Sequence, residues 1–95
     1  ELPFIAPEKV ASANGANGSP IWIVIDNIVY DVTKFSNVHP GGEMPLKNFA
    51  GQSCSWQFHK IHSRKTLETY GEKLKIGRTG DVPNPYKEER PGISR

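Results

Sequence analysis

The sequence is short of sulfur and of long apolar runs. It holds one cysteine, Cys54, and one methionine in 95 residues, which excludes an internal disulfide and is compatible with a reducing compartment. No window approaches the roughly 18 consecutive apolar residues of a membrane span. The first residues, ELPFIAPEKVA, lack the basic start and apolar run of a signal peptide. We therefore expect a soluble chain without a membrane span, in the cytoplasm or another reducing compartment.

A strong charge of either sign is also absent. Lys and Arg number 12 against 10 Asp and Glu, which gives a net charge of +2 and a pI near 8.8. The basic residues are interleaved with acidic ones, so a nucleic-acid partner is not expected. Ninety-five residues make one domain that buries about two-thirds of its unfolded surface, so its core is modest and a bound cofactor would add materially to it.

Turn and cap residues divide the chain into short elements. The segment 21–32 has two β-branched and aromatic runs around Asp26 and Asn27, which predicts a hairpin. Helices are expected at 7–13, 43–49, 53–60 and 63–70, and a short strand at 74–76 between Gly71 and Gly77. From Arg78 onward the sequence is Pro-rich and charged. We therefore expect one domain over 1–77 and a tail or linker over 78–95, as in a module cut from a longer protein.

The run HPGG at residues 39–42 places an imidazole before a proline and two glycines. Proline fixes its own φ and pushes the preceding residue toward extended conformations, and paired glycines allow a sharp turn or a close approach to something flat. His39 is thus expected on a stiff, narrow turn. It is either a turn residue or a ligand whose direction matters.

Two further histidines follow about twenty residues later in the run WQFHKIHS. Phe58, Ile61 and His62 are spaced to share the inner side of a helix end. His59 is three residues before His62 and would share a helical face with it, unless the break expected at Ser63 separates them.

Apolar residues surround both His39 and His62, and together they predict a flat slot with a nitrogen ligand on each side. Iron in a porphyrin needs such a site. The residues expected to wall the slot are Phe35, Val38, Leu46, Phe49, Phe58, Ile61 and Leu67.

Other ligands and roles fit the sequence less well. Zinc needs four ligands, and Cys54 with three histidines but no CxxC or HxxxH spacing is a poor match. Pairing Met44 with His39 would leave His62 unexplained. No CxxCH occurs, so covalent haem attachment is not expected. The remaining large residues, Trp22, Tyr30 and Trp56, are interpreted as packing residues, and Cys54 as a small buried one.

Over residues 4–77 the chain resembles the haem-binding domain of cytochrome b5. The resemblance rests on WIVIDNIVYDVTKF before the first histidine, HPGG at it, AGQSCSWQFHKIHS around the second, and the closing LKIG. His39 and His62 are 23 residues apart, one fewer than in the microsomal protein. The run IHSRKTLETYGEKLKIG is closer to the domains fused into nitrate reductase or flavocytochrome b2 than to the membrane-anchored form.

The resemblance implies an α+β fold, in which helix pairs on a small mixed β-sheet form a haem crevice. It implies one non-covalent haem b, protoporphyrin IX iron, per chain, with His39 and His62 as axial ligands. The cofactor-binding residues expected from it are His39, His62, Phe35, Val38, Pro40, Gly41, Leu46, Phe49, Phe58, Ile61, Ser63 and Leu67. Ser63 would hold a haem propionate; Arg64 and Lys65 would assist it electrostatically or simply be solvated.

With both axial positions filled, iron has no open site for oxygen or substrate, so the resemblance implies a one-electron carrier and not an enzyme in its own right. The alternative is a non-redox haem- or steroid-binding regulatory module. Relatives of that kind lack the histidine pair, and this chain has both residues.

The charge around the two histidines suggests a partner. Residues 43–65 hold Glu43 against Lys47, Lys60, Arg64 and Lys65, a local charge of +3. Because like charges suppress encounter and opposite charges favour it, a basic cytochrome c is disfavoured. We expect a monomer that meets a redox protein or domain with an acidic docking patch, such as a flavin reductase or a fused oxidoreductase domain.

Overall fold

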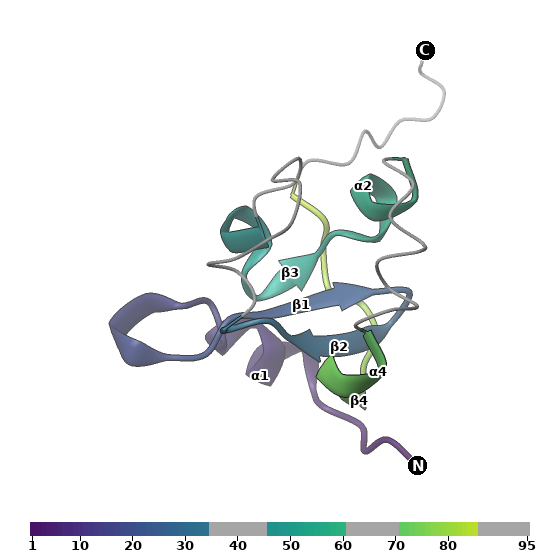
Figure 1. Ribbon diagram of the computed structural model, residues 1–95, viewed down its shortest axis with the longest axis horizontal. Helices are drawn as coiled ribbons and strands as arrows, with labels where there is room; N and C mark the ends of the chain where they lie inside the picture. Colours follow the sequence, from purple (N-terminus) through teal and green to yellow (C-terminus); the bar gives the residue numbers. More distant parts are fainter. Residues whose placement is uncertain (35–45, 61–70, 86–95) are drawn as a thin grey trace.

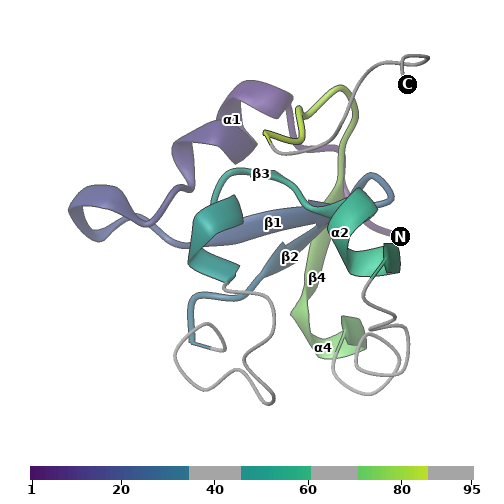
Figure 2. The ribbon, with the colours of Figure 1, turned by 90° about the horizontal axis from the view of Figure 1, so that it is seen from above.

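A computed structural model provides the structure of the chain and describes residues 1–34, 46–60 and 71–85. A four-stranded sheet of order β3-β1-β2-β4 runs through its centre. Helix α1 lies on one side of this sheet, and η3 and α2 lie on the other (Figures 1 and 2). The elements are α1 (Pro7–Ser12), η1 (Ala16–Gly18), β1 (Trp22–Ile25), β2 (Ile28–Asp31), η3 (Leu46–Phe49), β3 (Gln52–Ser53), α2 (Ser55–Lys60), α4 (Glu72–Leu74) and β4 (Lys75–Arg78).

The predicted hairpin is confirmed as β1 and β2, which pair antiparallel. Its turn residues Asp26 and Asn27 have φ of 53° and 64°. Positive φ at both central positions is the geometry of the hairpin turn that matches the twist of the strands, and Asn and Asp adopt it more readily than most residues. The first predicted helix is also confirmed, as α1, and begins at Pro7 where a missing N–H costs nothing.

The helix predicted over 53–60 begins later than expected. Residues 52–53 form β3, which pairs parallel with β1, and α2 starts only at Ser55. The placement of Ser53 in a helix was therefore wrong. The backbone N–H of Ser53 donates to the Pro83 carbonyl at 2.9 Å and that of Cys54 to the Val24 carbonyl at 2.9 Å. Both donors bond to distant segments, which overrides the local helical pattern.

Gly51 turns the chain between η3 and β3. Its φ is +76°, and a Cβ there would meet the Ala11 carbonyl oxygen at 2.9 Å. Both facts require glycine, so the predicted end of the preceding helix at this residue is confirmed. That helix is a 3-10 helix, η3, over the part described here. The rest of its predicted range, 43–45, and the predicted helix 63–70 lie outside the described residues.

The predicted strand at 74–76 is shifted toward the C-terminus. Leu74 ends the helical turn α4, and β4 runs from Lys75 to Arg78 beside β2. Gly77 lies inside this strand, where a Cβ would meet the Ile5 side chain at 2.5 Å. The glycine therefore does not end the strand. It allows the close approach of the N-terminal segment, which forms hydrogen bonds with β4 through Arg78.

Apolar side chains cover both faces of the sheet, because successive residues of a strand point to opposite sides. The α2-side cluster consists of Ile23, Ile25, Tyr30, Val32, Phe49, Cys54 and Phe58, with Ile21, Ile28 and Leu74 packed against it. The α1-side cluster consists of Val10, Val24 and Val29, with Ile5, Trp22, Ile76 and Val82 packed against it. The core is therefore divided in two by the sheet.

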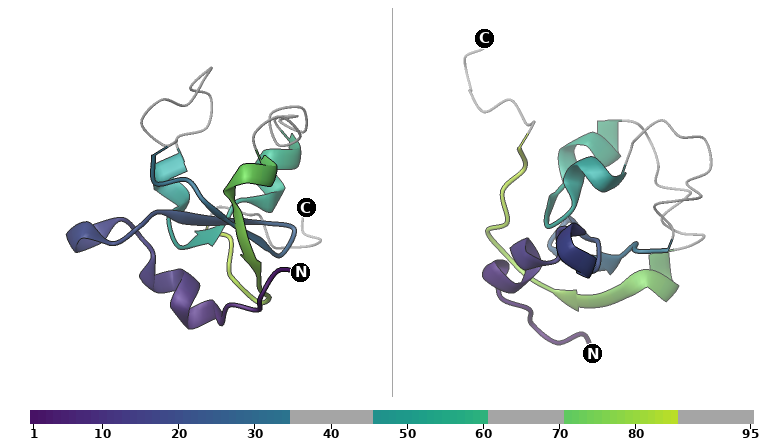
Figure 3. Two further views of the ribbon diagram at one scale, coloured as in Figure 1. Left: turned by 60° about the horizontal axis from the view of Figure 1, so that its bottom comes forward. Right: turned by 90° about the vertical axis from the view of Figure 1, so that its left-hand side faces the viewer.

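The residues after β4 return along the side of the domain toward α2 (Figure 3, right). Thr79 N donates to the Asn27 carbonyl at 2.8 Å, and the Pro83 carbonyl accepts from Ser53. Thus Arg78 belongs to the sheet, although we predicted a tail from 78. Four residues of the following segment also contact the domain, namely Thr79, Val82, Pro83 and Asn84. A domain boundary in this region stays a prediction. Among the described residues, no helix is long and apolar enough to cross a membrane.

Candidate functional site

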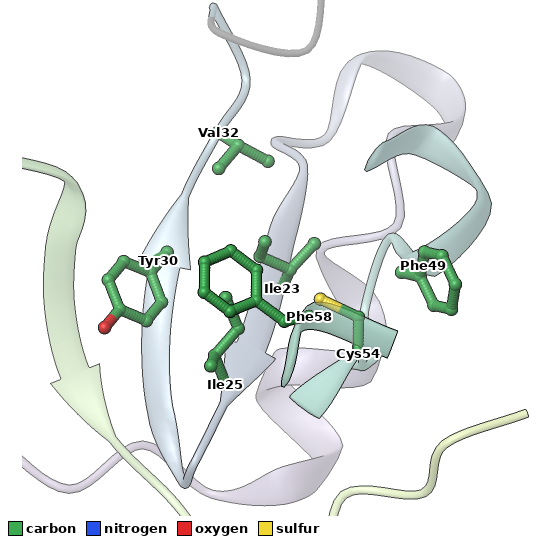
Figure 4. Packing of buried hydrophobic residues seen from close by; sticks show 7 residues of the cluster. All are labelled: Ile23, Ile25, Tyr30, Val32, Phe49, Cys54 and Phe58. Atoms are coloured by element: carbon green, nitrogen blue, oxygen red, sulfur yellow. The ribbon is translucent and has the colours of Figure 1, made fainter. Parts of the chain in front are cut away.

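The α2-side cluster combines apolar strand residues, which we call the floor, with the aromatic side chains of Phe49 and Phe58, which we call the walls. Ile23, Ile25 and Tyr30 on the strands are all less than 5% exposed, which follows from their alternation with residues of the other face. Phe58 from α2 lies over these strands, and Phe49 from η3 lies beyond Cys54 (Figure 4). Phe49 and Phe58 are 5% and 6% exposed.

Of the predicted cofactor-binding residues, Phe49 and Phe58 come together in this cluster. Leu46 begins η3, three residues before Phe49. The others lie outside the described residues: Phe35, Val38, His39, Pro40, Gly41, Ile61, His62, Ser63 and Leu67. Their positions, including those of both histidines, stay predictions.

The strand residues of the floor were not among the predicted site residues. Ile23, Ile25 and Val32 come from the hairpin, and Leu74 from α4. Residues were assigned to the site by their nearness to the histidines in the sequence, and these four belong instead to the predicted hairpin and the predicted strand 74–76. Alternating burial along the predicted hairpin was the signal that would have found three of them.

The turn after β2 is fixed by side-chain hydrogen bonds, six residues before His39 in the sequence. Thr33 donates to the Asp31 carboxylate twice, from its backbone N at 3.0 Å and from its hydroxyl at 2.6 Å. The same hydroxyl accepts from the Ile21 backbone N at 2.9 Å. The run DVTKF therefore contains a local side-chain turn that is tied to the neighbouring strand.

The start of α2 is fixed in a similar way. The Ser55 hydroxyl accepts from the Asp26 backbone N at 2.7 Å, and the Ser53 hydroxyl lies 3.3 Å from the Ser55 backbone N. Serine oxygens at a helix start satisfy backbone donors that lack helical partners. Phe58 N donates to the Cys54 carbonyl at 2.8 Å in the first turn. The hairpin turn thus positions the helix that ends two residues before His62.

The ionisable groups within the α2-side cluster are held neutral. Burial raises the pKa of the Cys54 thiol to about 12, against a smaller lowering by a backbone hydrogen bond. Burial also raises the pKa of Tyr30, and the charge of Asp26 adds to the effect. A cysteine binds zinc as the thiolate, and the raised pKa of Cys54 makes this residue unsuited to that role. Within the described ranges, no three His, Cys, Asp or Glu side chains gather in a way that would hold a metal ion.

The interpretation of the other aromatic residues as packing residues is confirmed for Tyr30, which is 4% exposed. Trp22 is half-buried and packs against the α1-side cluster. Trp56 is 39% exposed on α2, so its ring is only partly used in packing.

A cavity of about 450 Å³ lies beside the end of β2 and the start of β4. The two strands change register between Val29 and Tyr30, which leaves Ile76 unpaired at this point. The lining residues are Asp31, Thr33, Lys34, Lys73, Leu74 and Ile76. Two exposed lysines therefore border an opening next to Leu74, a residue packed on the α2-side cluster.

Comparison with known families gives one match over most of the chain. The family described as cytochrome b5-like heme/steroid binding domain matches residues 6–80. A candidate cytochrome b5 of Neurospora crassa is 47% identical over 69 residues, which cover 73% of this chain and 83% of that protein. The NADH nitrate reductase of Lotus japonicus is 41% identical over 69 residues, which cover 67% of this chain but only 8% of the enzyme.

Solved structures give the same result at the level of the fold. The cytochrome b5 of Ostreococcus tauri virus 2 superposes with a TM-score of 0.67 at 30% identity, over 80% of this chain and 95% of that one. A cytochrome b5 domain protein of Hadesarchaea superposes with a TM-score of 0.60 at 26% identity, over 83% of this chain and all of that one.

Proposed function

Because this chain belongs to the cytochrome b5-like heme/steroid binding family, we propose that it holds one haem b between His39 and His62 and carries single electrons. The predicted family and the predicted α+β fold of cytochrome b5 type are both confirmed. The observation that carries the proposal is the α2-side cluster. It joins the hairpin to η3 and α2, two elements that lie between His39 and His62 in the sequence.

The residues of this cluster suit a haem group. A porphyrin needs a flat apolar surface along its faces, and the cluster supplies aliphatic strand residues with Phe49 and Phe58 beside them. Its one sulfur atom belongs to a neutral thiol, which does not compete with imidazole for iron. When bound, haem would supply a one-electron couple whose potential depends on burial and on hydrogen bonds around the ligands.

The chain's own residues would bind and orient the group. The apolar residues of the cluster would exclude water, and the Asp31–Thr33 turn would fix the start of the segment that bears His39. Each ligand histidine is expected to donate its second ring N–H to an acceptor, for His39 a backbone carbonyl near the glycines. Ser63 is expected to hold a propionate. With an imidazole on each side of the iron, outer-sphere electron transfer is the chemistry left.

The family description also names steroid binding, which keeps a non-redox binding module as the second candidate. A visible spectrum separates the two functions. The haem-loaded protein, oxidised and then reduced with dithionite, is expected to give a low-spin six-coordinate spectrum with a sharp reduced α band. Failure to retain haem on a desalting column, or a high-spin spectrum, would contradict the proposed function.

The partner proposed is a redox protein or domain with an acidic docking patch, for example a flavin domain. Nitrate reductases contain a segment similar to this chain within a much longer protein, and this supports a relay between domains. Lys34 and Lys73 are exposed at one cavity and add cations to the basic residues noted in the sequence. We propose a monomer in a reducing compartment.

Charge reversal tests whether the basic residues near the two histidines guide the partner. The double variant Lys47→Glu with Lys60→Glu is expected to slow electron exchange with an acidic reductase about tenfold at low salt and to speed exchange with basic cytochrome c. Both effects should shrink as ionic strength passes 0.1 M, where the screening length is about 10 Å. Stopped-flow rates at two salt concentrations provide the measurement.

Lys9→Glu is the control for net charge, because Lys9 is exposed on α1, across the sheet from α2. It makes half the charge change of the double variant and should leave the rates nearly unaltered. Equal rates for the double variant and the parent with both partners would contradict a role of these basic residues in partner recognition.

A further inference from the structure

The segment 79–85, which we call the strap, connects two distant parts of the domain. It begins after β4, where Thr79 bonds to the hairpin turn through Asn27. It ends beside β3 and α2, where the Pro83 carbonyl accepts from Ser53 N at 2.9 Å. Figures 1 and 3 show its path from the β4 side of the sheet to the α2 side. The strap contains no helix or strand, so these bonds hold it in place.

One pair of side chains joins the strap to α2. Gln57 Nε2 donates to Asn84 Oδ1 at 3.1 Å, and Asn84 Nδ2 donates to Gln57 Oε1 at 2.7 Å. Each amide therefore uses a donor and an acceptor toward the other. Both residues are partly buried, so water competes less for these bonds than at an exposed site.

Helix α2 depends on contacts of this kind. It has six residues, and isolated helices shorter than about 12–15 residues are marginal in water. Its first turn is held by Ser55 and the hairpin turn. Gln57 lies next to Phe58, which is buried in the α2-side cluster, and so the amide pair acts one residue away from a wall of the candidate crevice.

We propose that Asn84 is a positioning residue, and that the strap, through the Gln57–Asn84 pair, holds α2 and Phe58 in the orientation that retains the cofactor. The part of this inference that concerns haem rests on the proposed function. The strap acts through α2, and Asn84 itself does not contact the cofactor.

A double-mutant cycle tests the pair. Gln57→Ala, Asn84→Ala and the double variant are compared with the parent by amide hydrogen exchange at Ser53 and Phe58, and by the rate of haem transfer to an excess of apomyoglobin. Either single variant is expected to speed exchange at both amides and haem loss about fivefold, the scale of a lost hydrogen-bonding pair. The double variant should match the single ones, because both remove the same interaction.

Two further variants make the result specific. Gln57→Asn with Asn84→Gln exchanges the two side-chain lengths and should restore parent-like exchange and haem retention. Asn48→Ala removes an exposed asparagine outside the strap and should alter neither.

Each other outcome counts against the inference. Three results would contradict the proposed role of the strap. They are unaltered exchange in the single variants, additive effects in the double variant, and failure of the swapped pair to restore exchange. Faster exchange with unchanged haem loss would overturn the positioning role. If the parent retained no haem, the proposed function and the haem part would fail, and the exchange rates would still decide whether the strap holds α2.

Discussion

Replacing His39 or His62 by alanine is expected to abolish stable haem binding or to convert the spectrum to a high-spin form. Each imidazole is proposed to fill one axial position. Its loss would leave one coordination position of the iron open and would weaken haem binding. The low-spin signal should disappear completely in either variant. Optical spectra of the purified variants, oxidised and reduced, provide the measurement.

His59→Ala is the matched control, since it removes the third histidine of the chain without touching either proposed ligand. Its spectrum should equal that of the parent protein. Loss of the low-spin spectrum in this variant alone would mean that the second ligand had been assigned one turn too late.

The haem-loaded protein is expected to melt about 15 °C or more above the cofactor-free protein. A ligand present at about 1,000 times its dissociation constant stabilises the native state by about 4 kcal/mol, and each kcal/mol moves the melting point of so small a domain by about 4–8 °C. The physical reason is that a macrocycle bound beside the α2-side cluster would bury its own apolar faces against apolar side chains.

Thermal melts followed by circular dichroism would measure this difference. His39→Ala with haem added is the control and should melt close to the cofactor-free parent. Superimposable melts of the loaded and cofactor-free parent would show that the cluster packs equally well without the cofactor.

Much of the fold could be predicted from local patterns. The hairpin was predictable because Asp26 and Asn27 suit positive φ and the flanking runs are β-branched. Strand β3 was not, because two residues carry no periodicity and Ser53 is placed by pairing with β1 and by a bond to Pro83. The start of β4 was displaced for a related reason, since Leu74 has the apolar character of a strand residue but packs from a helical turn.

The candidate site was predictable to the extent that its residues lie near the histidines. Phe49 and Phe58 were found in this way. The strand residues of the floor were missed because their contribution depends on the folded sheet. Asn84 was missed because Pro-rich composition describes a flexible segment, whereas its partner Gln57 lies 27 residues earlier in the chain. Composition carries no information about such a distant contact.

The division of the core by the sheet has a consequence for the order of assembly. The α1-side cluster unites α1 with the hairpin, and no predicted cofactor residue belongs to it. Hairpins form within about 1–10 μs from neighbouring residues. This half of the molecule therefore needs no cofactor in order to fold. We therefore expect the α1-side half of a nascent chain to fold first, and the prosthetic group to bind afterwards to a sheet that has already formed.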